Sequence, residues 1–122
     1  MCTILLSIHP EFVNKIISGQ KRYEFRKVKA KREPDKIIIY STSPICKVIG
    51  EAEIEQIIVN SPEVVWDVTK SYSGINKAFY IDYYANRDIA IAYKLKNVIE
   101  YDQPKELEEF GIKAAPQSFI YV

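Results

Sequence analysis

A glycine and three charged residues near the start of the chain are spaced as G-x-K-x-x-E-x-R, at Gly19, Lys21, Glu24 and Arg26. A carboxylate placed between two cations stays ionised and can hold the arginine in one orientation. An arginine held in this way presents a planar fork of donors that suits a phosphate group or the edge of a nucleobase. The motif is therefore a candidate anion- or nucleotide-binding site. An exposed ladder of ion pairs, which contributes about 0–1 kcal/mol, is an equal alternative from these residues alone.

The residue types around the motif predict how its side chains are displayed. In a β-strand, successive side chains point to opposite faces of the sheet. Tyr23 and Phe25 would then join a core on one face. Arg22, Glu24 and Arg26 would lie together on the other face. The pattern predicts a stiff strand that carries charge of both signs on one side.

Basic residues are concentrated in the segment that contains the motif. The chain of 122 residues has a net charge of only +1, yet residues 21–36 hold eight Lys or Arg against three Asp or Glu. The rest of the chain holds nine against thirteen. A basic segment on a nearly neutral protein indicates an anionic partner on one face. A solvated, lysine-rich loop is the alternative interpretation.

The sequence offers little that could bind a metal or a cofactor. Cys2 and Cys46 lack metal-ligand spacing, and the single histidine, His9, precedes Pro10, where a role at a helix start is favoured. No glycine-rich phosphate loop is present, so we expect neither a metal nor a cofactor. Because we find no secretory signal and no apolar run of about 18 residues, we expect a cytoplasmic protein with reduced thiols and no membrane span.

Length and hydrophobic patterning predict one domain over residues 1–122, with α+β architecture or a small mixed β-barrel. The predicted strands cover residues 3–8, 23–26, 36–40, 46–59, 89–95 with a continuation over 98–101 after a turn at 96–97, and 116–121. The predicted helices run from Pro10 to the stop at Gly19, from Pro62 onward with Ser61 as cap, and over residues 77–84, with a helical turn at 104–110. Three consecutive isoleucines in the third strand indicate burial on both faces, and Gly50 is a candidate bulge.

The motif resembles the signature of the ASCH domain, the activating-signal-cointegrator homology family. The resemblance extends over nearly the whole chain, because four other segments also look like parts of that family. These segments are Leu5–Phe12, Ile39–Pro44, Val48–Glu51 and Ala115–Phe119. The resemblance implies a PUA-like fold, which is a small mixed β-barrel of about six strands with flanking helices. It also implies a cleft between the barrel and the first helix, with the motif at its mouth.

The resemblance implies two kinds of function. Members of the family are proposed to bind RNA in connection with translation or transcription coactivation, one branch hydrolyses acylated cytidine, and some members are described as ribonucleases. The hydrolase branch pairs its motif lysine with a threonine nucleophile. Lys21 matches the lysine, but Glu24 stands where the threonine would be, so the nucleophile is absent. Amidohydrolase activity is therefore not carried over to this chain.

Our first hypothesis is an RNA- or nucleotide-binding module, linked to translation or transcription regulation, that uses a basic cleft. Basic residues would meet phosphates, aromatic residues would stack an unpaired base, and small polar residues would contact base edges. The candidate binding residues are Lys21, Arg22, Glu24, Arg26, Lys29, Arg32, Tyr40, Ser41, Ser43, Gln117 and Phe119, with Lys31 and Tyr80 as further possibilities.

The second hypothesis is a small metal-independent hydrolase that acts on modified cytidine or RNA. Lys21 would act as a base or oxyanion stabiliser, with its pKa lowered by Arg22 and Arg26, and Glu24 would be the partner acid or base. A third possibility is a protein-interaction domain on which the basic face is incidental.

Overall fold

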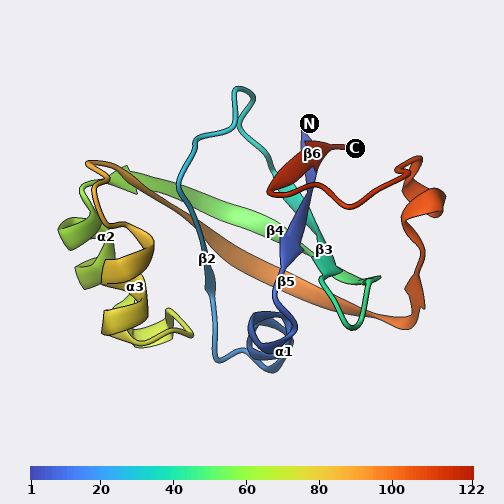
Figure 1. Cartoon of the computed structure of the whole chain (residues 1–122), viewed down its shortest axis with the longest axis horizontal. Coiled ribbons are helices and arrows are strands. Elements are labelled where there is room, and N and C mark those ends of the chain that lie inside the picture. The colour runs from blue at the N-terminus through green and yellow to red at the C-terminus, as the bar shows by residue number, and fades with distance from the viewer.

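A six-stranded mixed sheet forms the centre of the computed structural model, which describes every residue from Met1 to Val122 (Figure 1). The strands are β1 (Thr3–Ile8), β2 (Tyr23–Arg26), β3 (Lys36–Ser41), β4 (Lys47–Asn60), β5 (Ala90–Lys105) and β6 (Phe119–Tyr121). Their order across the sheet is β2-β5-β4-β3-β1-β6. Strands β1 and β3 are parallel, and the other neighbours are antiparallel. Strands β2 and β6 are thus the two edges.

Three α-helices and two 3₁₀ turns complete the chain. They are α1 (Pro10–Ser18), α2 (Pro62–Thr69), η1 (Lys70–Tyr72), α3 (Lys77–Tyr83) and η2 (Leu107–Phe110). The predicted helix signals are confirmed. Gly19 ends α1 in the left-handed region at φ 85°, and the side chains of Ser61 and Asn76 accept hydrogen bonds at the starts of α2 and α3. No helix combines the length and the apolar character that crossing a membrane would require.

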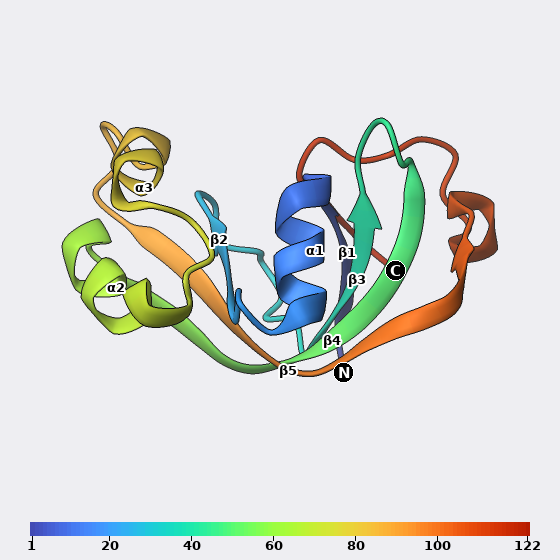
Figure 2. The ribbon, with the colours of Figure 1, turned by 90° about the horizontal axis from the view of Figure 1, so that it is seen from below.

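The two longest strands curl the sheet into a half-barrel. Figure 2 shows β4 and β5 as an arc beneath α1, with α2 and α3 at one end of the arc and η2 at the other. The pairing of β4 with β5 shifts register at three places, and each shift bends the ladder. One shift lies at Gly50, where a Cβ atom would collide with the carbonyl oxygen of Ile99. The predicted bulge at Gly50 is confirmed.

The predicted turn at residues 96–97 is wrong, because β5 runs without interruption from Ala90 to Lys105. Asn97 adopts a positive φ of 51°, and its side-chain amide donates a hydrogen bond to Glu53 on β4 at 2.7 Å. Asparagine tolerates this backbone conformation. The irregularity is therefore absorbed as a register shift between Glu51 and Glu53, and the strand bends without ending. The last strand is also shorter than predicted, since β6 begins at Phe119.

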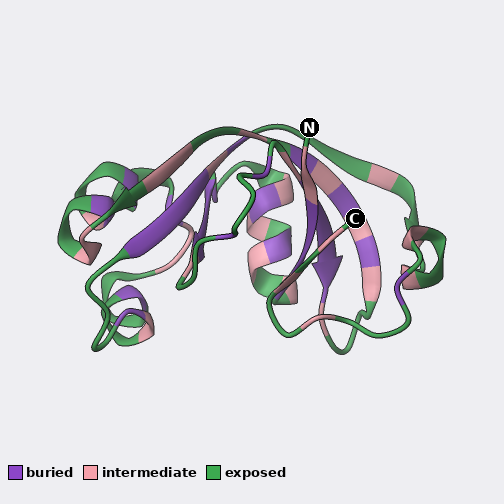
Figure 3. Ribbon diagram, turned by 90° about the horizontal axis from the view of Figure 1, so that it is seen from above, coloured by how far each residue is buried: buried purple, intermediate pink, exposed green.

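Three apolar clusters hold these elements together, and Figure 3 shows the buried stretches along the strands and on α1. The first lies between α1 and the sheet, where Val13 and Ile16 pack on strand residues such as Ile39. The second lies under α2 and α3. The third covers the other face of β1 and β3 and includes Ile38 and Ile112. The isoleucine strand is thus buried on both faces, as predicted.

Candidate functional site

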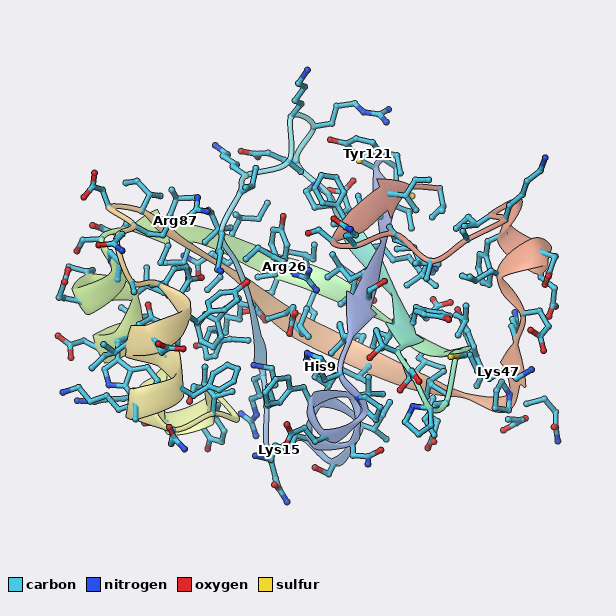
Figure 4. The ribbon with its side chains drawn as sticks, in the orientation of Figure 1. His9, Lys15, Arg26, Lys47, Arg87 and Tyr121 are labelled. Atoms are coloured by element: carbon cyan, nitrogen blue, oxygen red, sulfur yellow. The ribbon has the colours of Figure 1, made fainter.

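A cavity of about 470 Å³ lies beside the edge strand β2. Its walls come from β2, the end of β1, the start of α1, α3 and the residues just before β6. Figure 4 shows Arg26 between β2 and β1, His9 at the start of α1, and Arg87 on the side of α2 and α3. Four basic side chains and one carboxylate, that of Glu24, line the cavity. The fold therefore brings the charged motif to the hollow between the two open edges of the sheet.

Glu24 and Arg26 form a tight ion pair on one face of β2. The Nη2 atom of Arg26 donates to Glu24 Oε2 at 2.9 Å, and the side chains of Arg26 and Glu24 are only 11% and 9% exposed, respectively. Arg26 Nη2 also donates to the carbonyl of Ser7 on β1 at 3.1 Å, and Nη1 donates to the hydroxyl of Ser118 at 3.3 Å. Because β2 is not paired with β1 or β6 in the sheet, this guanidinium links the edge strand β2 to β1 and to the residue just before β6, which backbone hydrogen bonds leave apart from it.

One donor of Arg26 has no partner. Its Nε atom is buried and makes no hydrogen bond. A buried donor without a partner costs free energy, and such groups cluster where a ligand or water completes the site. Arg26 is therefore both a structural link and an incompletely satisfied group in the wall of the cavity.

Lys21 also lines this cavity, and its side chain is only 2% exposed. Its Nζ donates to the carbonyl of Ser73 at 2.8 Å and stands 4.0 Å from Glu24 Oε1. The same ammonium lies 4.7 Å from the ring centre of Phe25 and 5.4 Å from that of Phe12. Cation–π attraction of this kind partly compensates for lost hydration.

Burial lowers the pKa of Lys21 to about 8, against the attraction of Glu24, which raises it. Lys15 and Arg26 lower it further. Arg22, which the sequence pattern assigned to this effect, does not contribute, because its guanidinium turns away and stacks on Tyr72 at 4.0 Å. Loss of water around the ammonium is thus the main cause, and a sizeable fraction of Lys21 is neutral just above neutral pH.

A short loop between η1 and α3 holds Lys21 in place. Gly74 in this loop has a φ of +71°, and a Cβ atom there would lie 2.5–2.8 Å from the Cβ, Cγ and Cδ atoms of Lys21. The carbonyl of Gly74 accepts a hydrogen bond from Lys15 at 2.9 Å. Only glycine combines this backbone conformation with so close an approach. The loop therefore fixes the position of Lys21 from one side, and α1 fixes the loop from the other.

Comparison with known proteins identifies the family. A family model described as the ASCH domain matches residues 6–116. The chain belongs to the ASCH family. It is 31% identical over 109 residues to the ASCH domain-containing ribonuclease of Zymomonas mobilis, an alignment that covers 84% of this chain and 74% of that protein.

Two longer proteins of Ureaplasma parvum also contain a region similar to this ASCH chain. One is named ATP synthase subunit alpha (32% identical over 121 residues) and the other large ribosomal subunit protein uL22 (29% identical over 121 residues). Each alignment covers 98% of this chain, but the chain spans only 15% and 39% of the length of those two relatives.

Solved structures confirm the ASCH fold. The crystal structure of ASCH from Zymomonas mobilis matches with a TM-score of 0.89 at 27% identity, over 98% of this chain and 87% of that one. A variant of the same protein with a tyrosine changed to phenylalanine also matches at 0.89, with 26% identity over 98% and 89% of the two chains. The predicted PUA-like sheet of about six strands with flanking helices is therefore confirmed.

The structure gathers only part of the predicted ASCH site. Lys21, Glu24, Arg26 and Gln117 line the cavity. Lys29 and Arg32 lie outside it in an exposed loop, where Lys29 approaches Glu33 and Arg32 stacks on Tyr121 at 4.0 Å. Arg22 and Lys31 are also exposed and outside the cavity.

Several predicted contact residues are positioned by the core. Tyr40 packs in the third cluster, and Ser41 at the end of the same strand is buried. Ser43 lies in the turn that follows, and neither it nor Phe119 lines the cavity. Tyr80 is 2% exposed, its ring packs edge to face on that of Phe25 at 5.3 Å and its hydroxyl donates to the carbonyl of Pro62, so the ring is covered and does not offer a surface to a base.

Other residues of the cavity were not predicted from the sequence. Phe12 on α1 and Phe79 on α3 each belong to an apolar helical pattern and resemble core residues, yet their rings meet edge to face in the cavity wall, with centres 5.6 Å apart. Ser118 directly follows the predicted Gln117, so its place next to a candidate residue is the one sequence signal that could have identified it. Arg87 lies in a loop after α3 and has no sequence signal beyond its charge. The structure shows no group of three or more His, Cys, Asp or Glu side chains that could hold a metal ion.

Proposed function

We propose that the cavity binds one nucleotide of a single-stranded RNA. The observation that carries this proposal is the buried triplet of Lys21, Glu24 and Arg26, which is set in the wall of a hollow of about 470 Å³. Volumes of this size are typical of sites for small organic ligands. Fixed charges in a water-poor hollow interact strongly with a polar ligand and need little rearrangement when it binds.

The surroundings of the triplet suit a nucleotide in particular. Arg87 and Lys27 add positive charge around the cavity, as a phosphate requires. Phe79 is 46% exposed and stacks parallel to Tyr83 at 6.5 Å, so an aromatic surface is open to a base. Unpaired bases stack on such rings. Glu24 Oε1 accepts no hydrogen bond within the protein and lies 4.0 Å from the Lys21 ammonium, so it can accept one from an amino or hydroxyl group of a base or sugar.

The relatives support RNA as the polymer. One is named a ribonuclease and another a ribosomal protein. We extend the proposal to a role linked to translation or transcription, in which this chain binds an RNA of one of these processes through its cavity. The predicted basic cleft corresponds in this proposal to the cavity with its four basic side chains.

Fluorescence anisotropy with a labelled single-stranded RNA of mixed sequence tests the proposal. Affinity should fall steeply between about 50 and 200 mM salt, because phosphate contacts release counterions. Arg87→Ala should weaken binding about fivefold to twentyfold, as expected for loss of a charged hydrogen bond. Arg32→Ala is the matched control, since it removes the same charge from outside the cavity, and it should change affinity by about twofold or less. Equal losses in both variants, or no binding at low salt, would refute a site in the cavity.

The lowered pKa of Lys21 favours a second candidate function, metal-independent cleavage of RNA. The neutral amine of Lys21 would take the proton of a 2′-hydroxyl, whose oxygen then bonds to the adjacent phosphorus. The bond from phosphorus to the 5′-oxygen breaks, and that oxygen takes a proton from solvent. Lysines with pKa values near the working pH serve as general bases in this manner. Glu24 would orient the lysine and Arg26 would contact the phosphate.

A pH profile distinguishes cleavage from binding alone. Cleavage rates should rise with pH and level off above about 8, where Lys21 has lost its proton. Lys21→Met should abolish turnover of the RNA, and Lys21→Arg should not restore it, because arginine stays protonated. Turnover that survives Lys21→Met would exclude this mechanism and leave the binding proposal intact.

A further inference from the structure

A second cavity, of about 440 Å³, adjoins the first and has a different lining. It lies between α2 and α3, with Trp66 from α2 and Tyr80 and Ile81 from α3 in its walls. The ring centres of Trp66 and Tyr80 are 4.8 Å apart. The two cavities have one residue in common, Arg87, which is exposed and lines both.

The charges of the second cavity suit a base better than a phosphate. Two carboxylates line it, those of Glu63 and Asp67 on α2, and they balance the charges of its two cations, Lys77 and Arg87. Carboxylates repel phosphate, but they accept hydrogen bonds from the amino and imino groups of bases. The indole ring of Trp66 is half-buried and offers an aromatic surface. A planar group with N–H donors is therefore the ligand that this lining favours.

Arg87 occupies the place where the two ligands would be joined. In the first cavity four basic side chains against one carboxylate favour phosphate, whereas in the second two carboxylates offset two basic side chains. The guanidinium lies between these regions, and arginine is well suited to hold a phosphate by two parallel hydrogen bonds. A strand of RNA that places one nucleotide in each cavity has its linking phosphate at this residue.

We propose that the second cavity is the subsite for the neighbouring nucleotide of the same RNA strand. The base lies against the half-buried ring of Trp66, and the phosphate between the two nucleotides lies on Arg87. This inference rests on the proposed function of the first cavity. The shared arginine and the change in charge between the cavities favour RNA over a peptide. An RNA strand places a phosphate between successive bases, which matches Arg87 between the two cavities, whereas a peptide has no such regularly placed anion.

Titration calorimetry with nucleoside monophosphates and with dinucleotides tests the subsite. Wild-type protein should bind dinucleotides about tenfold more tightly than monophosphates, as expected for one further stacked base. Ala85→Trp places a large ring at an exposed position that lines only the second cavity. It should remove this tenfold gain and leave monophosphate affinity within about twofold. Ala78→Trp, on the exposed surface of α3 and outside both cavities, is the matched control and should retain the gain.

Each outcome separates the two proposals. If neither monophosphates nor dinucleotides bind, the proposed function fails and the subsite fails with it. If monophosphates bind but dinucleotides bind no more tightly, only the subsite is refuted. A gain that survives Ala85→Trp places the second nucleotide elsewhere and also overturns the inference. Thermal unfolding of both tryptophan variants verifies that each is folded before its affinity is compared.

Discussion

The two halves of one basic segment use the same residue types in opposite ways. In the motif, the side chains of Lys21 and Arg26 are 2% and 11% exposed, and each is fixed by defined partners. In the loop between β2 and β3, the side chain of Lys29 is 54% exposed and lies 3.7 Å from Glu33. Charge held out of water is costly and is therefore found where structure or function requires it. Burial, more than the number of basic residues, marks the candidate site.

Of the variants that test this comparison, removal of Arg26 should cause the largest loss of unfolding free energy. Arg26→Met removes the hydrogen-bonded partner of the buried Glu24, which then has only Lys21 at 4.0 Å, and it removes the links to Ser7 and Ser118. Breaking a buried ion pair on one side costs about 3–5 kcal/mol of unfolding free energy. Urea denaturation should show this loss.

The control variants for Arg26 separate charge from packing. Arg32→Met in the exposed loop should cost less than about 0.5 kcal/mol. The double variant Glu24→Gln with Arg26→Met should recover part of the loss, because no buried carboxylate then lacks its guanidinium, and Lys21 keeps its hydrogen bond to Ser73. Equal stabilities of Arg26→Met and Arg32→Met would contradict the contrast between the two regions.

Substitution of Gly74 should cause the next largest loss of stability, because Gly74 packs against the buried side chain of Lys21. Gly74→Ala forces an alanine into the left-handed region and drives its Cβ into the side chain of Lys21, at a total cost of about 2–4 kcal/mol. Gly111→Ala is a close control, since Gly111 has a φ of +74° but no neighbouring atom within 4 Å of where a Cβ would lie, and it should cost only about 1–2 kcal/mol. Chemical denaturation of both variants measures the difference. Similar losses would show that contact with Lys21 does not matter.

The contrast between the two regions also explains how far the sequence predicted this molecule. Alternation of residue types correctly predicted β2, and the positions of glycine and proline correctly predicted the ends of α1. These are local properties. Tyr40 was assigned to the site as an aromatic ring that could stack an unpaired base, but its ring belongs to the third cluster, on the other face of β1 and β3. Arg87 was missed because only tertiary packing brings the end of α3 beside β2.

The pH dependence of stability should distinguish the buried lysine from the exposed ones. Since the pKa of Lys21 falls from 10.5 to about 8 on folding, the unfolded chain binds more protons between these values. Stability from this group therefore rises with pH over that window, by about 2 kcal/mol between pH 7.5 and 9.5. Above pH 10 the tyrosines have the opposite effect, because folding raises the pKa of Tyr80 to about 12 and also raises that of Tyr84. The folded chain then binds more protons than the unfolded chain, so stability falls as the pH rises.

Variants isolate the contribution of this lysine from that of other groups. Urea denaturation at pH 7.5 and 9.5 should show the rise in wild-type protein and in Lys29→Met, and a rise smaller by about 2 kcal/mol in Lys21→Met. An identical pH dependence in Lys21→Met and wild-type protein would mean that the ammonium is hydrated in the folded state.

The exposed ion pair of Lys29 and Glu33 should give the smallest effect and marks the other end of the comparison. The two side chains are 54% and 69% exposed, so water competes for both charges and ordering two long side chains opposes the attraction. A double-mutant cycle with Lys29→Met and Glu33→Gln should give a coupling energy below about 0.5 kcal/mol that vanishes at high salt.

The corresponding cycle on Glu24 and Arg26 should give a coupling energy several times larger that responds little to salt, because neither charge is accessible to ions. Coupling energies of equal size and equal salt dependence would mean that β2 holds its charges no more firmly than the loop does, and the reason for placing the functional site there would be lost.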